Sequence, residues 1–522
     1  MSHPSAAWQA LLAHREALST TRIDGLFASD PRRGPAFTFR CGGLALDLSK
    51  QQLTAETLRL LLALAAEREV AGARERLFSG AVVNVTENRP ALHTALRGEE
   101  HVHVGAADVL PEIERCRERM RTLATAVREG AWRGATGEAL THVLAIGIGG
   151  SYLGPKLVVE ALAPTHPGPA VQFLANVDPT AADDALAGLD PARTLVVVAS
   201  KTFTTQETMV NARRVRQWML AGYEKSALPP DSVIARHFIA ATANTRAAGD
   251  FGIPEANVFP FADWVGGRYS VWSSVGLPIA LALGMPAFER FLAGAHAVDL
   301  EFRSTPAERN APLLFALAGI WNRNFLDIPV HVVLPYAQRL ASLPGYLQQL
   351  EMESNGKRVA ADGSPVASPS CPALFGEPGT LGQHAFHQWL HQGTDSVSVD
   401  FVVVAKPMGS DTEAHRLLLA HAAAQSEALM TGRITDNPHR DCPGNRPSTT
   451  IVLPALDAAS LGALVALYEH KVFVQGVIWG INSFDQYGVE LGKEIAGKIE
   501  PALRGDAASL HPATRHLLGL LQ

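Results

Sequence analysis

The stretch His142-Val-Leu-Ala-Ile-Gly-Ile-Gly-Gly-Ser-Tyr-Leu-Gly-Pro155 joins an apolar run to a loop of glycines and one serine. The apolar run at 143–148 is typical of a strand buried on both faces of a parallel sheet. The glycines, Gly150 among them, allow a tight turn and a close approach of the backbone to a ligand. A helix that begins near Ser151 would direct unpaired N–H groups and a hydroxyl at an anion such as phosphate. An ordinary strand-to-helix turn also fits, so this stretch alone leaves both interpretations open.

A second apolar run, at 194–199, is followed directly by Ser200-Lys-Thr-Phe-Thr-Thr-Gln-Glu-Thr208 and then by a helical pattern. Ligands of a doubly wound sheet bind at the carboxyl ends of adjacent strands, so the two loops together favour one anion site. Tyr152 stands where a dinucleotide-binding motif needs its third glycine, and the sequence has no Walker loop. The loops therefore favour a phosphorylated small molecule over a dinucleotide.

The composition is that of a globular enzyme of two or three domains, with 522 residues, 47% of them hydrophobic and 18% charged. The net charge of −6 is mild, and arginine-rich patches such as 114–121 alternate with glutamates. This pattern disfavours nucleic acid and anionic membranes as partners. The leucine-rich run at 58–66 is short and flanked by charges, so we expect neither an export signal nor a membrane span.

The four cysteines are scattered without Cys-x-x-Cys spacing; they are Cys41, Cys116, Cys371 and Cys442. Such spacing is typical of reduced thiols in the cytosol rather than of a disulfide framework or a zinc site. We therefore expect a cytoplasmic protein without disulfides.

Strand and helix patterns alternate through the middle of the chain, which predicts a parallel α/β domain. The predicted strands lie near Val143, Val171, Leu195, His237 and Asn257. Further strands are predicted at 330–334, 401–405 and 450–453, and a strand pair at 37–48 turns at Gly42-Gly43. We predict a smaller domain at 111–275 and a larger discontinuous domain made of 1–110 and 276–522.

Two short segments carry candidate chemistry at an anion. Arg268 follows two glycines directly, so its guanidinium could lie against an oxyanion, although a surface arginine after a turn fits as well. The segment 347–357 is predicted to be a helix with Gln349 and Glu353 one turn apart on one face, and Glu351 roughly 200° away from Glu353. Glu353 could serve as a general base, or it could be a solvated glutamate at a helix end.

Two further segments contain groups that transfer protons. His384, His387 and His391 have helical i, i+3, i+7 spacing, which could form a metal site. No acidic residue or cysteine joins this stripe, so an acid–base role for His384 is the better interpretation. Lys493 falls on the shoulder of an apolar helical stripe, where either a partly buried ammonium or a surface lysine fits.

Six motifs occur in one order along most of the chain: Gly-Ile-Gly-Gly-Ser at 147–151, Ser-Lys-Thr-Phe-Thr-Thr-Gln-Glu-Thr at 200–208, Gly-Gly-Arg-Tyr-Ser at 266–270, Met-Glu-Ser-Asn-Gly-Lys at 352–357, Gly-Gln-His-Ala-Phe at 382–386 and Val-Glu-Leu-Gly-Lys at 489–493. In these motifs the sequence resembles the glucose-6-phosphate isomerase (phosphoglucose isomerase) family. Tyr487 stands where the family usually has tryptophan, and Leu350 where glycine is common. Neither departure removes a group that the chemistry needs.

The resemblance implies two sugar-isomerase (SIS) α/β domains, the smaller with a parallel sheet and the larger with a mixed or parallel sheet, plus a helical C-terminal segment. It also implies reversible interconversion of glucose 6-phosphate and fructose 6-phosphate, a reaction of glycolysis and gluconeogenesis, with no cofactor and no metal. A related isomerase that also accepts mannose 6-phosphate and a non-catalytic sugar-phosphate sensor are the alternatives. The sensor would not need Arg268, Glu353, His384 and Lys493 together.

The family's site maps onto this sequence residue by residue. By resemblance the phosphate would be held by Ser151, Ser200, Lys201, Thr202 and Thr205, beside Gly150, with Thr204 nearby. His384 and Lys493 would open the sugar ring, Glu353 would move a proton between C2 and C1, and Arg268 would stabilise the cis-enediolate. Gln349 and Gln486 would be amides that contact the substrate. The family's site lies between subunits, with His384 from the partner chain, so the resemblance implies a homodimer.

Overall fold

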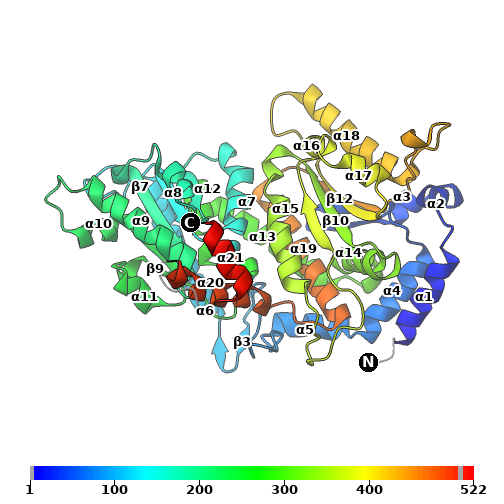
Figure 1. Cartoon of the computed structure of the whole chain (residues 1–522), viewed down its shortest axis with the longest axis horizontal. Coiled ribbons are helices and arrows are strands. Elements are labelled where there is room, and N and C mark those ends of the chain that lie inside the picture. The colour runs from blue at the N-terminus through cyan, green and yellow to red at the C-terminus, as the bar shows by residue number, and fades with distance from the viewer. Residues whose placement is uncertain (1–4, 504–509, 522) are drawn as a thin grey trace. The chain divides into compact units, whose positions relative to one another are not determined.

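The computed structural model describes residues 5–503 and 510–521. The chain divides into two compact units, residues 1–483 and 484–522, and each is treated by itself below. Two large β-sheets, a short two-stranded sheet and the helices around them make up the first unit, and two helices near the C-terminus make up most of the second (Figure 1). The two-sheet α/β architecture is the one that the alternation of strand and helix patterns predicts.

The smaller sheet has five parallel strands in the order β6-β5-β7-β8-β9. The strands are β5 (His142–Ile146), β6 (Ala170–Leu174), β7 (Thr194–Ala199), β8 (Phe238–Thr242) and β9 (Val258–Pro260). All six residues of β7 and all five of β8 are buried, as expected of strands with helices on both faces. Each of the five strands lies at or next to its predicted position.

Helices connect the strands of this sheet and cover it. They are α6 (Leu110–Arg128), α7 (Leu153–Leu162), α8 (Pro179–Leu186), α9 (Gln206–Gly222), α10 (Pro230–His237) and α11 (Thr245–Asp250). The chain passes from β5 to β6 on one side and then crosses to β7 on the other side of β5. The ends of β5 and β7 therefore form a topological switch point, where open α/β sheets bind their ligands.

The larger sheet is mixed and has the order β1-β2-β13-β12-β10-β11. Its strands are β1 (Thr38–Cys41), β2 (Leu44–Asp47), β10 (Val330–Tyr336), β11 (Ala373–Gly376), β12 (Val397–Val404) and β13 (Ser448–Leu453). Strands β10 to β13 are parallel, whereas β2 pairs antiparallel with β13 and β1. The predicted N-terminal strand pair thus extends a sheet whose other strands come from after residue 330. Strand β11 was not predicted.

Before the first strand of the small sheet, the chain forms α1 (Ala6–Ala17), α2 (Ile23–Ser29), α3 (Arg33–Ala36), α4 (Ala55–Glu67), α5 (Val70–Ser79) and the short pair β3 (His103–Val104) and β4 (Ala107–Asp108). Helix α4 begins with the capping box of Thr54 and Thr57, in which each side chain bonds to the other residue's backbone N–H.

After the small sheet follow α12 (Leu277–Leu283), α13 (Met285–Ser304), α14 (Ala311–Ile320), α15 (Leu343–Gln348), α16 (Gly379–Gln383), α17 (His387–Gln392), α18 (Thr412–Thr431) and α19 (Ala458–Trp479). Helix α19 packs on α13 and α14 in the core. It is long and apolar enough to cross a membrane, but 94% of its most apolar window is buried inside the protein. Packing in the core therefore accounts for its apolar sequence.

The second unit contains a 3₁₀ turn (Tyr487–Val489), helix α20 (Glu490–Ala502) and helix α21 (Pro512–Leu520). Pro512 stands in the first turn of α21, where its missing N–H has no intrahelical partner to lose. The unit supplies the predicted helical C-terminal segment.

Candidate functional site

The loop after β5 is packed against the segment that carries Arg268. Its 3₁₀ turn, Gly149–Ser151, leads into α7, and Gly149 has the left-handed φ of +57° that favours glycine. A Cβ on Gly150 would overlap the carbonyl group of Gly267 and would lie 2.6 Å from the backbone N of Arg268. Close backbone contact, rather than ligand approach alone, thus accounts for the glycine at position 150.

The loop after β7 has an internal hydrogen-bond network of hydroxyls. The buried Ser200 Oγ accepts from the backbone N–H of Phe203 at 3.1 Å and lies 3.2 Å from Thr205 Oγ1. Thr204 donates from its hydroxyl to Thr202 Oγ1 at 2.8 Å. Phe203 is held at a φ of +55°, which is uncommon for a residue with a side chain and marks a tightly constrained turn.

Helix α9 begins at the end of this loop. Thr205 is its N-cap residue and makes no side-chain capping bond to the first helical N–H groups. The first N–H groups of α9 and the positive end of its dipole therefore lie at the end of the loop that contains Ser200 and Thr202. The sequence predicted this combination of hydroxyls and a helix N-terminus as the place of a phosphate.

Lys201 points to the chain that precedes Arg268. Its ammonium donates to the carbonyl oxygens of Asp263 at 2.8 Å and Val265 at 3.1 Å. Burial lowers the pKa of this lysine. The side chain therefore ties the second loop to the segment of Arg268, and contact between its ammonium and a phosphate stays a prediction.

Arg268 is buried, with 2% of its surface exposed, so the alternative of a surface arginine is wrong. Its Nε donates to Ser354 Oγ at 2.6 Å, and its Nη2 donates to the carbonyl oxygen of Ser483 at 2.6 Å. The hydroxyl of Tyr269 lies 2.9 Å from the same Ser354 Oγ. The guanidinium is thereby fixed in place.

Glu353 lies next to this arginine, with its Oε2 atom 3.8 Å from Arg268 Nη1. The arginine side chain is 1% exposed, whereas that of Glu353 is 19% exposed. The pair therefore combines a buried, permanently charged cation with a carboxylate that solvent or a small ligand can reach.

The backbone around Glu353 differs from the predicted α-helix. Helix α15 ends at Gln348, and Gln349–Glu353 form a π-helical turn, so Gln349 and Glu353 are not one α-helical turn apart. Single π-helical turns are rare and frequently occur at functional sites. Glu351 does point away from Glu353, as predicted, because its carboxylate is buried in an ion pair with Lys471 of α19.

Gln349 connects this turn to the loop after β5. A Cβ on Gly149 would lie 3.0 Å from Gln349 Nε2, and the Oε1 atom of Gln349 is buried with no partner among the described residues. Buried polar atoms without partners are rare in folded proteins and call for an explanation. The contact of Gln349 with the substrate stays a prediction.

The predicted histidine stripe is not one helical face, and this expectation was wrong. Helix α16 ends at Gln383 and α17 begins at His387, so the helix is interrupted at His384, which is exposed. His387 and His391 instead share Gln425 Oε1, at 3.2 and 2.8 Å. Within residues 5–503 and 510–521 no group of three His, Cys, Asp or Glu side chains has the arrangement of a metal site.

Gln486 and Lys493 belong to the second unit. Gln486 precedes the 3₁₀ turn, and Lys493 lies exposed in the first turn of α20. Their roles at the substrate stay predictions from the family motif Val-Glu-Leu-Gly-Lys.

Sequence analysis missed the residues that hold Arg268 and Glu353 in place. Ser354 bonds to the guanidinium, and Lys471 pairs with the buried Glu351. Ser354 stands in the quoted Met-Glu-Ser-Asn-Gly-Lys motif directly after Glu353, so the motif itself carried the signal. Lys471 lies in an apolar helix more than a hundred residues away and gave no comparable signal.

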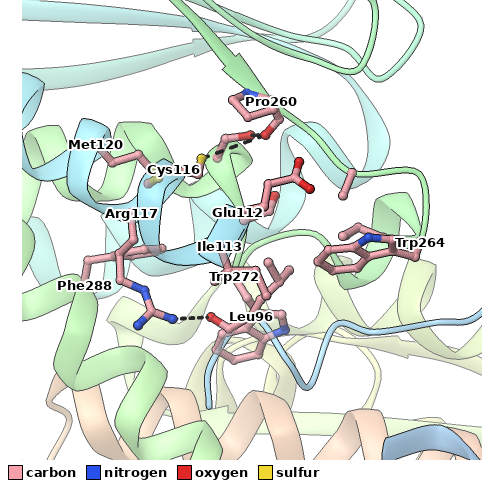
Figure 2. Close-up of a pocket in the computed structure, with 14 residues that line it drawn as sticks. Leu96, Glu112, Ile113, Cys116, Arg117, Met120, Pro260, Trp264, Trp272 and Phe288 are labelled. Carbon is pink, nitrogen blue, oxygen red and sulfur yellow. Dashed lines mark hydrogen bonds between the residues drawn. The ribbon is translucent and has the colours of Figure 1, made fainter. Parts of the chain in front are cut away.

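A small cavity is lined in part by Pro260 and Trp264, which precede Arg268 in the chain (Figure 2). Its lining is mostly apolar, and Trp264 and Trp272 line it together with residues of α6. Arg117 at its edge donates to the carbonyl oxygen of Leu96 at 3.0 Å. Its volume of about 40 Å³ is far below the roughly 300–1,000 Å³ of pockets that bind small molecules, so we do not assign it to the substrate.

The fold and these contacts define an α/β protein with a topological switch point beside a buried arginine and an accessible glutamate. A family model described as phosphoglucose isomerase matches residues 47–518. The chain belongs to the phosphoglucose isomerase family.

Individual relatives agree with this assignment. The chain is 48% identical to a glucose-6-phosphate isomerase of Methylococcus capsulatus, over 96% of this chain and 95% of that protein. It is 49% identical to one of Ruegeria pomeroyi, over 95% of each chain. A crystal structure of a glucose-6-phosphate isomerase from Chlamydia trachomatis superimposes with a TM-score of 0.86 at 33% identity, over 99% of this chain and 98% of that one.

Proposed function

We propose that this protein interconverts glucose 6-phosphate and fructose 6-phosphate, as the names of its relatives indicate for them. The observation that carries the proposal is the pair of Arg268 and Glu353, 3.8 Å apart, with the backbone of Arg268 packed against Gly150. An aldose–ketose isomerisation needs a base for the proton next to the carbonyl and a cation for the oxyanion that develops. The pair supplies both.

The phosphate of the sugar binds at the ends of β5 and β7 in this proposal. Ser151, Ser200, Thr202, Thr205 and the N-terminus of α9 surround the switch point, and Lys201 fixes the loop. Binding energy at the phosphate holds the reacting carbons at Glu353. The phosphate and the reacting carbons thus lie at opposite ends of the substrate.

Glu353 then transfers the proton between C2 and C1, and Arg268 stabilises the cis-enediolate. A positioned general base typically contributes roughly 10² to 10⁴ in rate. The guanidinium needs no reorganisation during the reaction, because Ser354 and the Ser483 carbonyl already hold it. Gln349 contacts the substrate from the same turn as Glu353.

Ring opening requires an acid and a base at the ring oxygen and the anomeric hydroxyl. We assign it to His384 and Lys493, with Gln486 at the substrate. His384 is exposed, and we assign it to the site of a second subunit, as the family resemblance implies. The proposal therefore includes a cytoplasmic homodimer with its active sites between subunits and domains at 111–275 and at 1–110 with 276–522.

Replacing Glu353 with Gln tests the proposal. The amide keeps the shape of the side chain but cannot accept the proton, so we expect turnover to fall by at least about 10²-fold while binding of a sugar-alcohol phosphate stays within a few-fold of the wild type. Exchange of the C2 proton with deuterated solvent should stop as well. Glu255→Gln, at an exposed glutamate of a 3₁₀ turn, is the control and should have normal turnover.

Near-normal isomerisation by Glu353→Gln would contradict the assignment of the base. The same coupled assay, run on glucose, mannose and fructose 6-phosphates, decides whether mannose 6-phosphate is also a substrate. Binding of all three without turnover by the wild-type protein would instead favour a sugar-phosphate sensor.

A further inference from the structure

One buried helix, α19, contacts the turn of Glu353 on the side opposite Arg268. Lys471 of α19 forms an ion pair with Glu351, and the two side chains are 3% and 1% exposed. The ammonium also lies 5.1 Å from the ring centre of Phe315 and 5.4 Å from that of Tyr468. The lysine is therefore held on several sides and has little freedom to follow a moving partner.

A second contact joins the same segment to α19 one helical turn further on. Asn355 donates from Nδ2 to the carbonyl oxygen of Val472 at 2.9 Å, and its Oδ1 accepts from Ser483 Oγ at 2.6 Å. Residues 351 and 355 thus face α19, whereas Glu353 and Ser354, between them, face Arg268. The buried contacts fix the backbone from the side opposite the proposed base.

These contacts with α19 bear on the direction of Glu353, because the backbone between them is π-helical. A π-helical turn contains one more residue than an α-helical turn in the same hydrogen-bonded loop, and isolated examples need support from their surroundings. If Gln349–Glu353 closed into an α-helix, Glu353 would rotate relative to Glu351. While Lys471 holds Glu351, such a rotation would carry Glu353 away from Arg268.

Stability alone does not account for a buried ion pair at this place. Replacing such a pair with apolar residues of similar volume is often neutral or stabilising, because both charges lose their hydration on burial. A requirement for one defined geometry is a better explanation of why two charges stand here.

We propose that Lys471 and Glu351 are positioning residues for Glu353: their ion pair fixes the π-helical turn so that the Glu353 carboxylate faces Arg268. This inference rests on the proposed function, in which Glu353 transfers the proton. Neither Lys471 nor Glu351 touches the reacting atoms in this scheme.

The test compares three variants. Glu351→Gln keeps an oxygen that accepts from Lys471 but removes the negative charge of the pair, so its kcat should fall less than that of Lys471→Met, which loses the contact altogether. Lys471→Met should lower kcat by about 10- to 100-fold, the cost of a misplacement of up to about 1 Å, with the KM for fructose 6-phosphate changed less than about threefold. Because Lys471→Met leaves a buried charge unpaired and could fail to fold, the double variant Lys471→Met/Glu351→Met removes both charges and should show the same loss of kcat.

A ligand pair separates positioning from general damage. A planar, anionic mimic of the enediolate should bind the double variant about 10- to 100-fold more weakly, whereas a sugar-alcohol phosphate should bind as it does to the wild type. Arg33→Met is the matched control, since Arg33 is another buried cation and donates to the carbonyls of Ser49, Gln51 and Leu53 rather than to the site. It should lower stability without this selective loss.

Wild-type kcat in the folded double variant would overturn the inference, as would a loss confined to KM. Glu353→Gln, measured alongside, separates this failure from a failure of the proposed function. If Glu353→Gln is inactive while the double variant keeps its kcat, only the positioning role falls. If Glu353→Gln turns over normally, the proposed base itself is wrong.

Discussion

Replacing Gly150 with Ala perturbs the contact between the two halves of the proposed site. The added Cβ would overlap the Gly267 carbonyl and lie 2.6 Å from the backbone N of Arg268. Carbon atoms pack comfortably at about 3.5 Å, so the two backbones must separate by about 1 Å. Both sides of the contact are backbone atoms, and no side chain can rotate away to make room.

This separation should have two measurable effects. A displacement of about 1 Å between the phosphate loop and Arg268 should lower kcat/KM by about 10²-fold. Overpacking should also lower the free energy of unfolding by about 1–3 kcal/mol, which outweighs the gain of about 0.4–1 kcal/mol that Gly→Ala brings by restricting the unfolded chain. Steady-state kinetics and urea unfolding measure the two quantities.

Gly345→Ala is the matched control for this experiment. Gly345 lies in α15, next to the turn that bears Glu353, and a Cβ there would have no atom within 4 Å. It should keep normal kinetics and gain slightly in stability. Wild-type kcat/KM in a folded Gly150→Ala protein would refute the contact as a constraint on catalysis.

Three other changes test separate parts of the site and its surroundings. Ser200→Ala removes a hydroxyl from the proposed phosphate loop and should raise KM and the inhibition constant of inorganic phosphate by about tenfold, with a smaller change in kcat; an unchanged KM would count against the loop. Lys201→Met removes the bonds to the carbonyls of Asp263 and Val265, so kcat should fall as well as phosphate affinity, and an effect on KM alone would show that the lysine acts only on the phosphate. Burial lowers the pKa of His387 to about 4, so as the pH falls below about 6.5 the unfolded chain binds a proton that the folded protein does not. The free energy of unfolding should therefore drop by about 2 kcal/mol between pH 7 and pH 5. In urea titrations at several pH values, His387→Asn should remove that part of the pH dependence.

Local sequence patterns predicted most of the fold because its strands are long and apolar. Val196, Val197 and Val198 are fully buried in β7, and a run of this kind has few alternatives to a central parallel strand. Strand β11 has only the residues Ala-Leu-Phe-Gly and lies partly exposed at the sheet edge, so nothing in its composition distinguishes it from a loop. The pairing of β2 with β13 is a contact between distant segments that only a packed core determines.

The interrupted helix at His384 shows tertiary packing overriding a periodic pattern. Phe386 packs edge-on against Phe375, with ring centres 5.0 Å apart, and both rings pack against the core cluster of the larger sheet. A Cβ on Gly382 would lie 2.8 Å from the ring of Phe386, so this chain segment folds back closely on itself. The spacing of the histidines could not reveal that the chain folds back here. The three histidines were therefore predicted on one helix, whereas α16 ends at Gln383, before the first of them.

The geometry of Arg268 and Glu353 depends on which groups hold the arginine. A closer, bidentate ion pair would occupy both carboxylate oxygens and leave none for a substrate proton. Ser354 and the Ser483 carbonyl instead satisfy the guanidinium from other directions, and the nearest distance to Glu353 stays at 3.8 Å. The arginine is thus close enough to favour a negative charge beside Glu353 without occupying both carboxylate oxygens. The groups that produce this spacing, Ser354 and the Ser483 carbonyl, bond to the arginine and not to the proposed base.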